Sequence, residues 1–445
     1  MALPFDTFAA TLEYEDLPQE LLWTLRRSFT DTIGTAAVAS TTEMANVARR
    51  GALAVFGAGS AGSARILMHG GSVSPVGAAM AGAFTVDAVD AHDTTTPCKG
   101  HAGSAVFPAL LALADAIDRP VTGAEFAVWL TVAYEVSYRA GLAQHATCAD
   151  YHTSGAWTST GVATAAARAM GLTSQQIRHA AGIGEFHGPR SQMMRCIDHP
   201  TMLRDGVGWG APSGLTAAYL AREGFTGAPA LTCEQTPAFW EDLGTAWRTV
   251  EDTSYKPYPC CRWAHPSIDA SAELMAAHGL TAQDVAGVDI RTFHNATRLA
   301  GHTPATLDEF SYSIAFPVAC MIVRGDIGVA ELAPETLSDP DILRLSKSVQ
   351  LIDDDHYTKI SIAKRWAEVT IRTTDGRAFT SAPRSPRGDR DDPLSDTEIS
   401  DKFHRFSDPV LGRARADEIE DLSGRFDSLD ATDFARLLDL CLSAP

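Results

Sequence analysis

From residue 1 to about 250, apolar positions recur at the three- and four-residue spacing of helices, and Gly or Pro separates one apolar run from the next. Many of these runs are apolar around nearly the whole helical circumference, which is typical of helices buried in a thick bundle. The pattern predicts helices over Leu17–Ser40, Ala105–Ala116, Thr122–Arg139, Thr158–Met170, Ser174–Gly182 and Pro212–Arg222.

The pattern changes near residue 255. Val285–Phe293 and Ala367–Arg372 alternate apolar and polar residues as strands do, and Thr374-Asp375-Gly376 marks a hairpin turn before a further strand over Arg377–Ser381. The polar run Pro383–Pro393 indicates a linker. Helical spacing is found at Ser313–Arg324, Asp341–Val349, Ser395–Arg405 and Ala431–Leu442.

These elements predict a mainly α protein with two domains. Residues 1–257 and 391–445 are expected to form a large all-helical domain, and residues 258–390 a smaller α+β lid domain inserted into it. The chain has 445 residues, of which 45% are hydrophobic and 20% charged, so it can bury a large core and is not disordered throughout.

The charge balance argues against a nucleic-acid partner. With 36 Lys+Arg against 55 Asp+Glu, the formal net charge is −19, whereas a general phosphate-binding face needs clustered Lys and Arg. A few buried cations can still bind an anionic small molecule inside a negatively charged protein.

The N-terminal residues contain no basic region, and Asp6 precedes any apolar run, so we expect no signal peptide. Uncharged stretches such as Pro75–Val86 and Gly103–Ala114 are about a dozen residues long, whereas a membrane-spanning helix needs about 20. The eight cysteines form no C-x-x-C pair, which argues against structural zinc and a secreted disulfide framework. These features predict a cytoplasmic protein without a membrane segment.

The run Gly57–Gly62 matches the G-x-G-x-x-G pattern of dinucleotide-binding loops. Such a loop requires a preceding strand and an acidic residue about 20 positions further on. Here a helix-like segment precedes the run, and the next acidic residue is Asp87. We therefore interpret it as a flexible Gly-rich turn.

Reactive side chains are concentrated between two apolar helices, in residues 87–101. The segment contains three carboxylates, two histidines, a lysine and a thiol: Asp87, Asp90, Asp93, His92, His101, Lys99 and Cys98. A solvated loop would explain this composition without function. However, an apolar helix follows directly at Gly103-Ser104, so we expect Lys99 and His101 at a helix N-terminus, which attracts anions and shifts pKa values.

Three further groups of side chains are candidates for a carboxylate-binding site. Tyr151-His152 precede a helix, where a hydroxylated cap explains the neighbouring Thr153-Ser154 but not His152. The stretch Lys256–His265 joins basic, aromatic and thiol groups at the domain junction, where pockets commonly form. The third group suits bidentate carboxylate binding, with a surface ion-pair loop as an equal alternative: Arg190, Arg195, His199 and Arg204.

These motifs resemble those of the MmgE/PrpD family over nearly the whole chain. They are Asp31-Thr-Ile-Gly34, the stretch from Asp90 to Ser104, Tyr134-Glu135-Val136 with Arg139, Tyr151-His152, Lys256-Pro-Tyr-Pro-Cys-Cys-Arg262 with His265, and the stretch from Pro386 to Phe403. The resemblance implies a homodimer and chemistry on di- or tricarboxylates with neither metal nor organic cofactor. It places the family's active-site polar groups at Asp90, Thr94, His101, His152 and Lys256.

The family includes 2-methylcitrate dehydratase, cis-aconitate decarboxylase and iminodisuccinate epimerase. Leu203 with Arg204 stands where many members have a lysine, Phe316-Pro317 stands where decarboxylases place a tyrosine, and the loop Thr94–Lys99 is unusual. The resemblance is greatest to the epimerase, so we expect a cofactor-independent epimerase of a polycarboxylate such as iminodisuccinate. The alternatives are a hydro-lyase like 2-methylcitrate dehydratase, a lyase like cis-aconitate decarboxylase, or a protein that binds carboxylates without catalysis.

Epimerisation needs two acid–base groups on opposite faces of a carbon next to a carboxylate. We expect Lys99 with His101 to serve one face and Tyr151 or His152 the other, with Tyr138/Arg139 as substitutes for the latter pair. A two-thiol route through Cys98 and Cys260 is a further alternative. No metal ligands are expected, and the residues expected to bind substrate are Asp90, Thr94, Cys98, Arg139, Arg204, Lys256 and Arg262.

Overall fold

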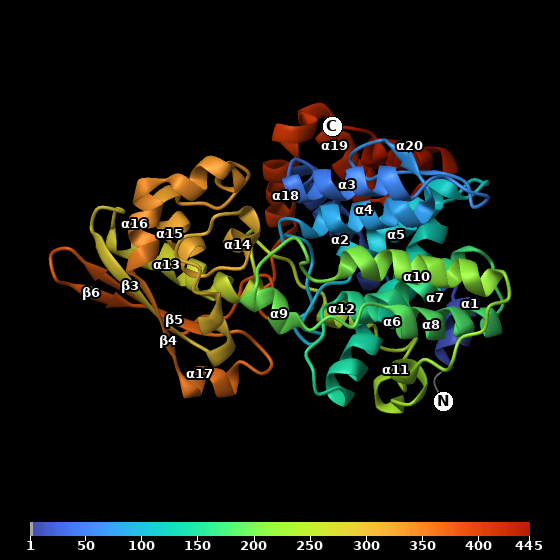
Figure 1. Cartoon of the computed structure of the whole chain (residues 1–445), viewed down its shortest axis with the longest axis horizontal. Coiled ribbons are helices and arrows are strands. Elements are labelled where there is room, and N and C mark those ends of the chain that lie inside the picture. The colour runs from blue at the N-terminus through green and yellow to red at the C-terminus, as the bar shows by residue number, and fades with distance from the viewer. Residues whose placement is uncertain (1–2) are drawn as a thin grey trace.

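The computed structural model describes residues 3–445. It is mainly helical, with a small mixed sheet in the C-terminal part, which confirms the expected fold class (Figure 1). The helical part lies at the right of Figure 1 and the part that contains the sheet at the left. None of the helices in residues 3–445 has the length and apolarity that crossing a membrane requires.

The N-terminal part consists of helices and one short two-stranded ribbon. Each helix expected from the apolar spacing is present, and the one predicted to end at Arg139 continues to Thr147. The elements are α1 (Phe5–Thr11), α2 (Gln19–Ala39), α3 (Glu43–Val55), β1 (Ala64–Arg65), β2 (Ser72–Val73), α4 (Pro75–Asp87), α5 (Gly103–Ala116), α6 (Gly123–Thr147), α7 (Gly155–Ala169), α8 (Ser174–His187), α9 (Met193–Asp198), α10 (Val207–Arg222), α11 (Leu231–Glu234) and α12 (Arg248–Asp252).

Helix α7 forms the centre of this part, and its residues are buried except Arg168. It packs against α6, α8 and α10. Small residues permit these close crossings, since a Cβ on Gly161 would lie 2.5 Å from the backbone oxygen of Ala133 in α6. The uniformly apolar runs of the sequence are therefore helices that other helices enclose.

The Gly-rich run at residues 57–62 is a turn between α3 and β1, with an isolated bridge between Gly59 and Gly62. Since a helix precedes it where the dinucleotide-binding motif requires a strand, the interpretation as a turn agrees with the structure.

The C-terminal part combines helices with a four-stranded sheet in the order β4-β3-β5-β6. β3 pairs with β4 in parallel and with β5 antiparallel, and β5 forms the expected hairpin with β6 around Gly376. The elements are α13 (His265–His278), β3 (Val285–Thr292), α14 (Leu307–Ser311), α15 (Ala315–Arg324), α16 (Pro340–Ser348), β4 (Val349–Asp353), α17 (Asp355–Ile360), β5 (Ala367–Thr373) and β6 (Ala378–Thr380).

Strand β5 alternates buried and half-buried residues along its length, as the apolar–polar alternation predicted. Helices α13, α15 and α16 contact the sheet through β5, β4 and β3 respectively. Strand β4 is not predicted from the sequence, because it is short, directly follows a helix and has only one buried residue, Val349, so it lacks a clear apolar–polar alternation.

The chain then returns to the helical part as α18 (Asp396–Leu411), α19 (Arg413–Ser423) and α20 (Ala431–Leu442). α18 packs against α2, where a buried ion pair joins Lys402 Nζ to Asp31 Oδ1 at 2.6 Å. The two segments that connect the parts run side by side, since the Tyr255 N–H donates to the Gly388 carbonyl at 3.1 Å. The domain boundaries at residues 257/258 and 390/391 remain a prediction.

Candidate active site

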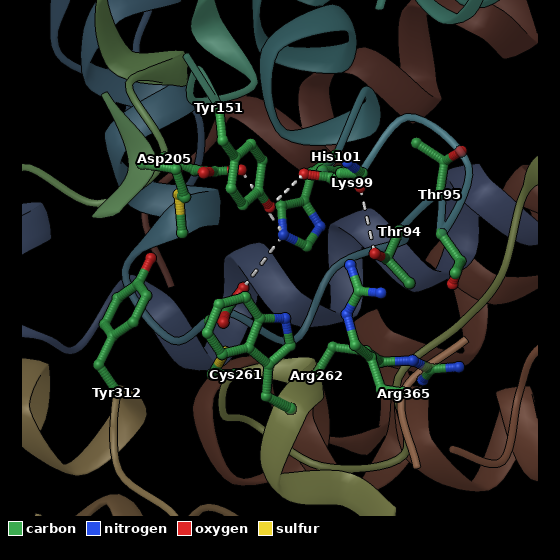
Figure 2. Close-up of a pocket in the computed structure, with 15 residues that line it drawn as sticks. Thr94, Thr95, Lys99, His101, Tyr151, Asp205, Cys261, Arg262, Tyr312 and Arg365 are labelled. Atoms are coloured by element: carbon green, nitrogen blue, oxygen red, sulfur yellow. Dashed lines mark hydrogen bonds and ion pairs between the residues drawn. The ribbon is translucent and has the colours of Figure 1, made fainter. Parts of the chain in front are cut away.

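A cavity lies where the helical part meets the part that contains the sheet (Figure 2). Most of its lining comes from segments that connect the α-helices and strands: the loop between α4 and α5, the turns that precede α7, α10, α13 and β5, and the turn between α14 and α15. Met193, at the start of α9, also lines it. Such segments on a rigid scaffold commonly carry functional side chains. The lining residues are Asp90, Thr94, Thr95, Thr96, Lys99, Gly100, His101, Tyr151, Met193, Asp205, Cys261, Arg262, Trp263, Tyr312 and Arg365.

The backbone is strained at this point. Asp90 and Lys99 have φ angles of 51° and 54°, and Arg204, which precedes a lining residue, has 49°. Left-handed conformations are unfavourable for residues other than glycine and cluster at functional sites. The loop is held in place by paired hydrogen bonds of 2.8 Å between the backbones of Thr94 and Ser254, and by the Tyr151 hydroxyl, which donates to the Lys99 carbonyl at 2.8 Å.

His101 presents an unprotonated nitrogen to the cavity. Its Nδ1 lies 2.9 Å from the Asp93 carbonyl oxygen, which can only accept a hydrogen bond, so the proton of a neutral ring is on Nδ1. Burial, the Lys256 ammonium and the neighbouring His92 hold the pKa of His101 well below its usual value, so the ring is neutral at neutral pH. Its Nε2 therefore has a free lone pair, 3.6 Å from Asp90 Oδ1 and 3.7 Å from Asp205 Oδ2.

His92 differs from His101 because of its partners. Both of its nitrogens face oxygen acceptors, the Asp93 carbonyl at 3.1 Å and the Asp87 carboxylate at 3.2 Å. Burial disfavours the charged ring, but the hydrogen bond to Asp87 and the surrounding carboxylates outweigh it, and the pKa of His92 is raised. The charged form of His92 is therefore favoured. The ring lies outside the cavity wall, and its charge helps to lower the pKa of His101.

Lys256 also lies behind the cavity rather than on its wall. Its side chain is fully buried, and its Nζ donates to the Asp90 carbonyl at 2.9 Å and to the Asp90 carboxylate. Its ammonium compensates the charge of Asp90, and a role for Lys256 in binding substrate stays a prediction.

Three cationic side chains reach the cavity. Lys99 comes from the helical part, and burial together with the charge of Arg365 lowers the pKa of its ammonium. Arg262 is bound to Asp389 at 2.6 Å, and its Nε has no hydrogen-bond partner in residues 3–445. Arg365 lies against the rings of Trp263 and Phe293, and one of its nitrogens donates to the Ser361 carbonyl at 2.7 Å. These cations make the cavity suited to an anionic ligand.

Asp90, His92 and His101 each place one potential metal-ligand atom within 4.8 Å of the others. These groups already have partners, because both His92 nitrogens bind oxygen atoms and Asp90 binds the Lys256 ammonium. A divalent cation here would meet the charges of Lys256 and His92, so the group does not fit a metal site. The expectation that the enzyme uses no metal stays a prediction.

The cavity brings together about half of the residues that the sequence singled out. Those on its wall are Asp90, Thr94, Lys99, His101, Tyr151 and Arg262. Lys256 stands directly behind Asp90, and four residues lie elsewhere: His152, Cys98, Arg139 and Arg204.

Three of these residues have side-chain partners outside the cavity, namely Arg139, Arg204 and Cys98, whereas His152 Nδ1 has no hydrogen-bond partner in residues 3–445. Arg139 is fully buried between Glu135 and Asp242, and Arg204 is bound to Asp308 at 2.8 Å. Burial lowers the pKa of His152, which forms a backbone bridge with Gln192.

The positions and the pKa values of Cys98 and Cys260 argue against the two-thiol route. Cys98 donates to the Tyr138 carbonyl at 3.2 Å and does not line the cavity, and neither does Cys260. Burial raises the pKa of both thiols, so both are protonated at neutral pH.

Sequence reasoning missed Asp205 and Arg365, together with Cys261, Trp263 and Tyr312. Asp205 adjoins Arg204, and Cys261 and Trp263 belong to the stretch Lys256–His265, so the local sequence carries a signal for these three residues. Arg365 and Tyr312 stand in no motif, and only the fold brings them to the cavity.

The fold and the site define the class of protein to which the chain belongs. Residues 5–244 match the MmgE/PrpD N-terminal domain and residues 258–427 match the MmgE/PrpD C-terminal domain. The chain is therefore a member of the MmgE/PrpD family.

Among curated proteins, the chain is similar to cis-aconitate decarboxylases at low identity. It is 22% identical to the enzyme of Aspergillus terreus over 421 residues, which cover 85% of this chain and 84% of the relative. It is 23% identical to the human enzyme over 465 aligned residues, which cover 99% of this chain and 94% of the relative.

Proposed function

We propose that this protein is an enzyme that acts on a small di- or tricarboxylic acid and passes through negative charge on a carbon next to a carboxylate. The observation that carries the proposal is the neutral His101, whose free Nε2 faces a cavity with Lys99, Arg262 and Arg365 on its wall. The names of the curated relatives, which are carboxylate lyases, support the same substrate class.

The chemistry follows from the residue types. A carbon acid next to a carboxylate is weak, so the site must stabilise the charge that develops on the carboxylate oxygens, and preorganised cations in a water-poor cavity do this. The lone pair of His101 Nε2 can take a proton from that carbon, and the resulting imidazolium can return one. Tyr151 acts on this step indirectly, because its hydroxyl holds the Lys99 carbonyl and thereby the strained turn that carries the Lys99 side chain.

We favour a lyase outcome, in which the negative charge forms by loss of carbon dioxide or expels a leaving group. The relatives named cis-aconitate decarboxylase match over most of the chain. The expectation of an epimerase rested partly on Phe316 at the place of a late tyrosine, but Tyr312, four positions earlier, lines the cavity. Phe316 is buried in the apolar core of the C-terminal part.

An epimerase of iminodisuccinate is the second candidate. It requires a second acid–base group on the other face of the reacting carbon. Lys99 is such a group, since the lowered pKa of its ammonium eases loss of a proton, and it lines the same cavity as His101.

Proton NMR in D₂O on EDTA-treated protein tests these outcomes with cis-aconitate, 2-methylcitrate and iminodisuccinate as separate substrates. We expect cis-aconitate to be decarboxylated to a product with a new methylene signal, or 2-methylcitrate to give an alkene. Exchange of the α-proton of iminodisuccinate with interconversion of its stereoisomers, and no alkene from the other acids, would establish the epimerase instead. No reaction with any of the three would contradict the proposed substrate class.

His101→Gln is expected to lower kcat by roughly 10²- to 10⁴-fold, because glutamine fills the space but cannot accept a proton. The matched control is His356→Gln, since His356 is exposed on α17 and away from the cavity. The measurement is the initial rate on the substrate identified by NMR. A His101→Gln rate within a few-fold of the unchanged protein would exclude His101 as the base.

A further inference from the structure

Asp205 is a buried carboxyl group on the wall of the cavity, and neither the sequence motifs nor the mechanism above uses it. The residue is 2% exposed. Its Oδ2 accepts a hydrogen bond from the Ser154 hydroxyl, whereas its Oδ1 has no hydrogen-bond partner in residues 3–445. A buried carboxyl oxygen without a partner is costly when it is charged and requires an explanation, for which protonation or a catalytic role are candidates.

Within residues 3–445, no lysine or arginine forms an ion pair with Asp205, although the charge of His92 favours its carboxylate form. The neighbouring Arg204 directs its guanidinium to Asp308 at 2.8 Å and to the Ala88 carbonyl at 2.5 Å. Lys256 is bound to Asp90, the other carboxylate next to His101. Figure 2 shows Asp205 and Tyr312 at the left of His101, while Arg262 and Arg365 lie toward the right.

Its surroundings favour the protonated form. Burial and then the charge of Asp87 raise the pKa of Asp205 to about 7, although the hydrogen bond from Ser154 lowers it. The titratable and charged groups that face Asp205 from the surrounding segments are Asp87, Asp90, His92, His101, Tyr151, Cys196, Arg204, Cys261 and Tyr312.

We propose that Asp205 and His101 form a proton-exchanging pair, in which the Asp205 carboxyl supplies or takes up the proton that His101 Nε2 delivers to or removes from the substrate. The two groups are suited to this because Nε2 and Oδ2 lie 3.7 Å apart inside the cavity and both are buried. The inference rests on the proposed function, since it names a second acid–base group for the same reaction.

The transfer balances in both directions. When the substrate loses carbon dioxide, the protonated Asp205 gives its proton to Nε2 of the neutral ring and becomes a carboxylate. The electron pair left on carbon takes that proton from the imidazolium, which returns the ring to its neutral form, and Asp205 regains a proton from solvent. When the substrate loses a proton, Nε2 binds that proton and the Asp205 carboxylate takes it from the ring. Because both groups lie on one side of the cavity, they serve one face of the reacting carbon, which suits a lyase better than an epimerase.

The pH dependence of kcat tests the pair in the unchanged protein, Asp205→Asn and Ser154→Ala. We expect an ionisation near pH 7 in the unchanged protein. Asp205→Asn should lose this ionisation and lower kcat by roughly 10- to 100-fold, with KM within about threefold. Ser154→Ala should keep the ionisation but move it to higher pH, because the hydroxyl that stabilises the carboxylate is gone.

An Asp205→Asn profile identical to that of the unchanged protein would overturn the proposal. If Asp205→Asn does not fold, Ser154→Ala decides alone, since an ionisation that stays in place or moves to lower pH contradicts the pair.

A second measurement does not depend on activity. The infrared difference spectrum of the unchanged protein minus Asp205→Asn should contain a carboxylic-acid C=O band at pH 6 that disappears by pH 8. If no acid is turned over but the band titrates, the proposed function fails while the shared proton stands. A protein that turns over its substrate without this band has a different proton donor.

Discussion

At the scale of single residues, the charge of each side chain at the site depends on the groups that it contacts and not only on its residue type. The rings of His92 and His101 are 4.4 Å apart, yet one is held charged and the other neutral. The difference is that His92 contacts the Asp87 carboxylate through its second nitrogen, whereas the second nitrogen of His101 faces the cavity. A charged residue behind the site thus helps to keep the base in front of it unprotonated.

Lys256→Met tests the buried ion pair at this scale. The variant leaves the Asp90 carboxylate buried without its ammonium partner, so we expect the free energy of unfolding to fall by about 3–5 kcal/mol. Urea denaturation gives the value. Combining Lys256→Met with Asp90→Asn should recover most of the lost free energy of unfolding. A double variant whose loss equals the sum of the two single losses would show that the two groups are not coupled.

Asp205→Asn should also change stability in a pH-dependent way. Because the pKa of Asp205 is raised above its ordinary value of 3.8, the folded protein binds more protons than the unfolded chain between about pH 4 and 7. Stability therefore falls as pH rises through this window, and asparagine removes that loss. We expect the Tm of the variant minus that of the unchanged protein to be larger at pH 8 than at pH 5, which calorimetry at both pH values will show. A constant difference would mean that Asp205 does not titrate in this window.

At the scale of elements, glycines decide how closely helices approach. A Cβ on Gly34 in α2 would lie 2.8 Å from Phe403 Cδ2 and 3.2 Å from Phe403 Cα in α18. This contact adjoins the ion pair of Asp31 and Lys402, and Lys402 also donates to the Ala91 carbonyl next to Asp90 at 2.5 Å. The contact between α2 and α18 therefore also supports the loop that carries the site.

Gly34→Ala is expected to lower the free energy of unfolding by about 1–3 kcal/mol, because the added methyl forces the two helices apart. Gly51→Ala in α3 is the matched control, since nothing lies within 4 Å of the added methyl. That control should gain about 0.5–1 kcal/mol from helix propensity alone. Urea denaturation of both variants decides, and equal effects in both would contradict a steric role for Gly34.

At the scale of the whole molecule, the site is completed only by the contact between the two parts. The helical part provides Lys99 and His101, and the part that contains the sheet provides Arg262, Tyr312 and Arg365. A carboxylate bound between Lys99 and Arg365 would join the parts and shield charges that otherwise repel. The homodimer and the cytoplasmic location stay predictions at this scale.

A bound di- or tricarboxylate should therefore stabilise the whole protein, by about 2.7 kcal/mol at a ligand concentration of 100 Kd. Arg365→Met should abolish the shift in Tm while its apolar stem keeps its place against Trp263 and Phe293. Arg377→Met, on the exposed hairpin of β5 and β6, is the control and should keep the full shift. Thermal scanning with cis-aconitate gives both values, and an undiminished shift in Arg365→Met would remove Arg365 from the binding site.

The sequence by itself determined the helices and strands with a strong periodic pattern, although not short elements such as β4. The apolar spacing of α2 and the alternation of β5 are local properties, since each residue's face follows from its position in a regular element. The same holds for the loop from Asp90 to His101 and for Arg262, because strained turns and helix starts next to apolar runs have a local composition that marks them.

Only the tertiary structure decided which charged residues face the cavity. Arg139 belongs to a sequence motif and Arg365 to none, yet Glu135 and Asp242 bind Arg139 inside the helical part while Arg365 reaches the site. Asp205 and Lys256 are also both buried and ionisable, but they differ in their contacts. Asp90 compensates the charge of Lys256, whereas one carboxyl oxygen of Asp205 has no hydrogen-bond partner in residues 3–445. The partner of Lys256 comes from a distant part of the chain, so its identity is fixed when the elements pack and not before.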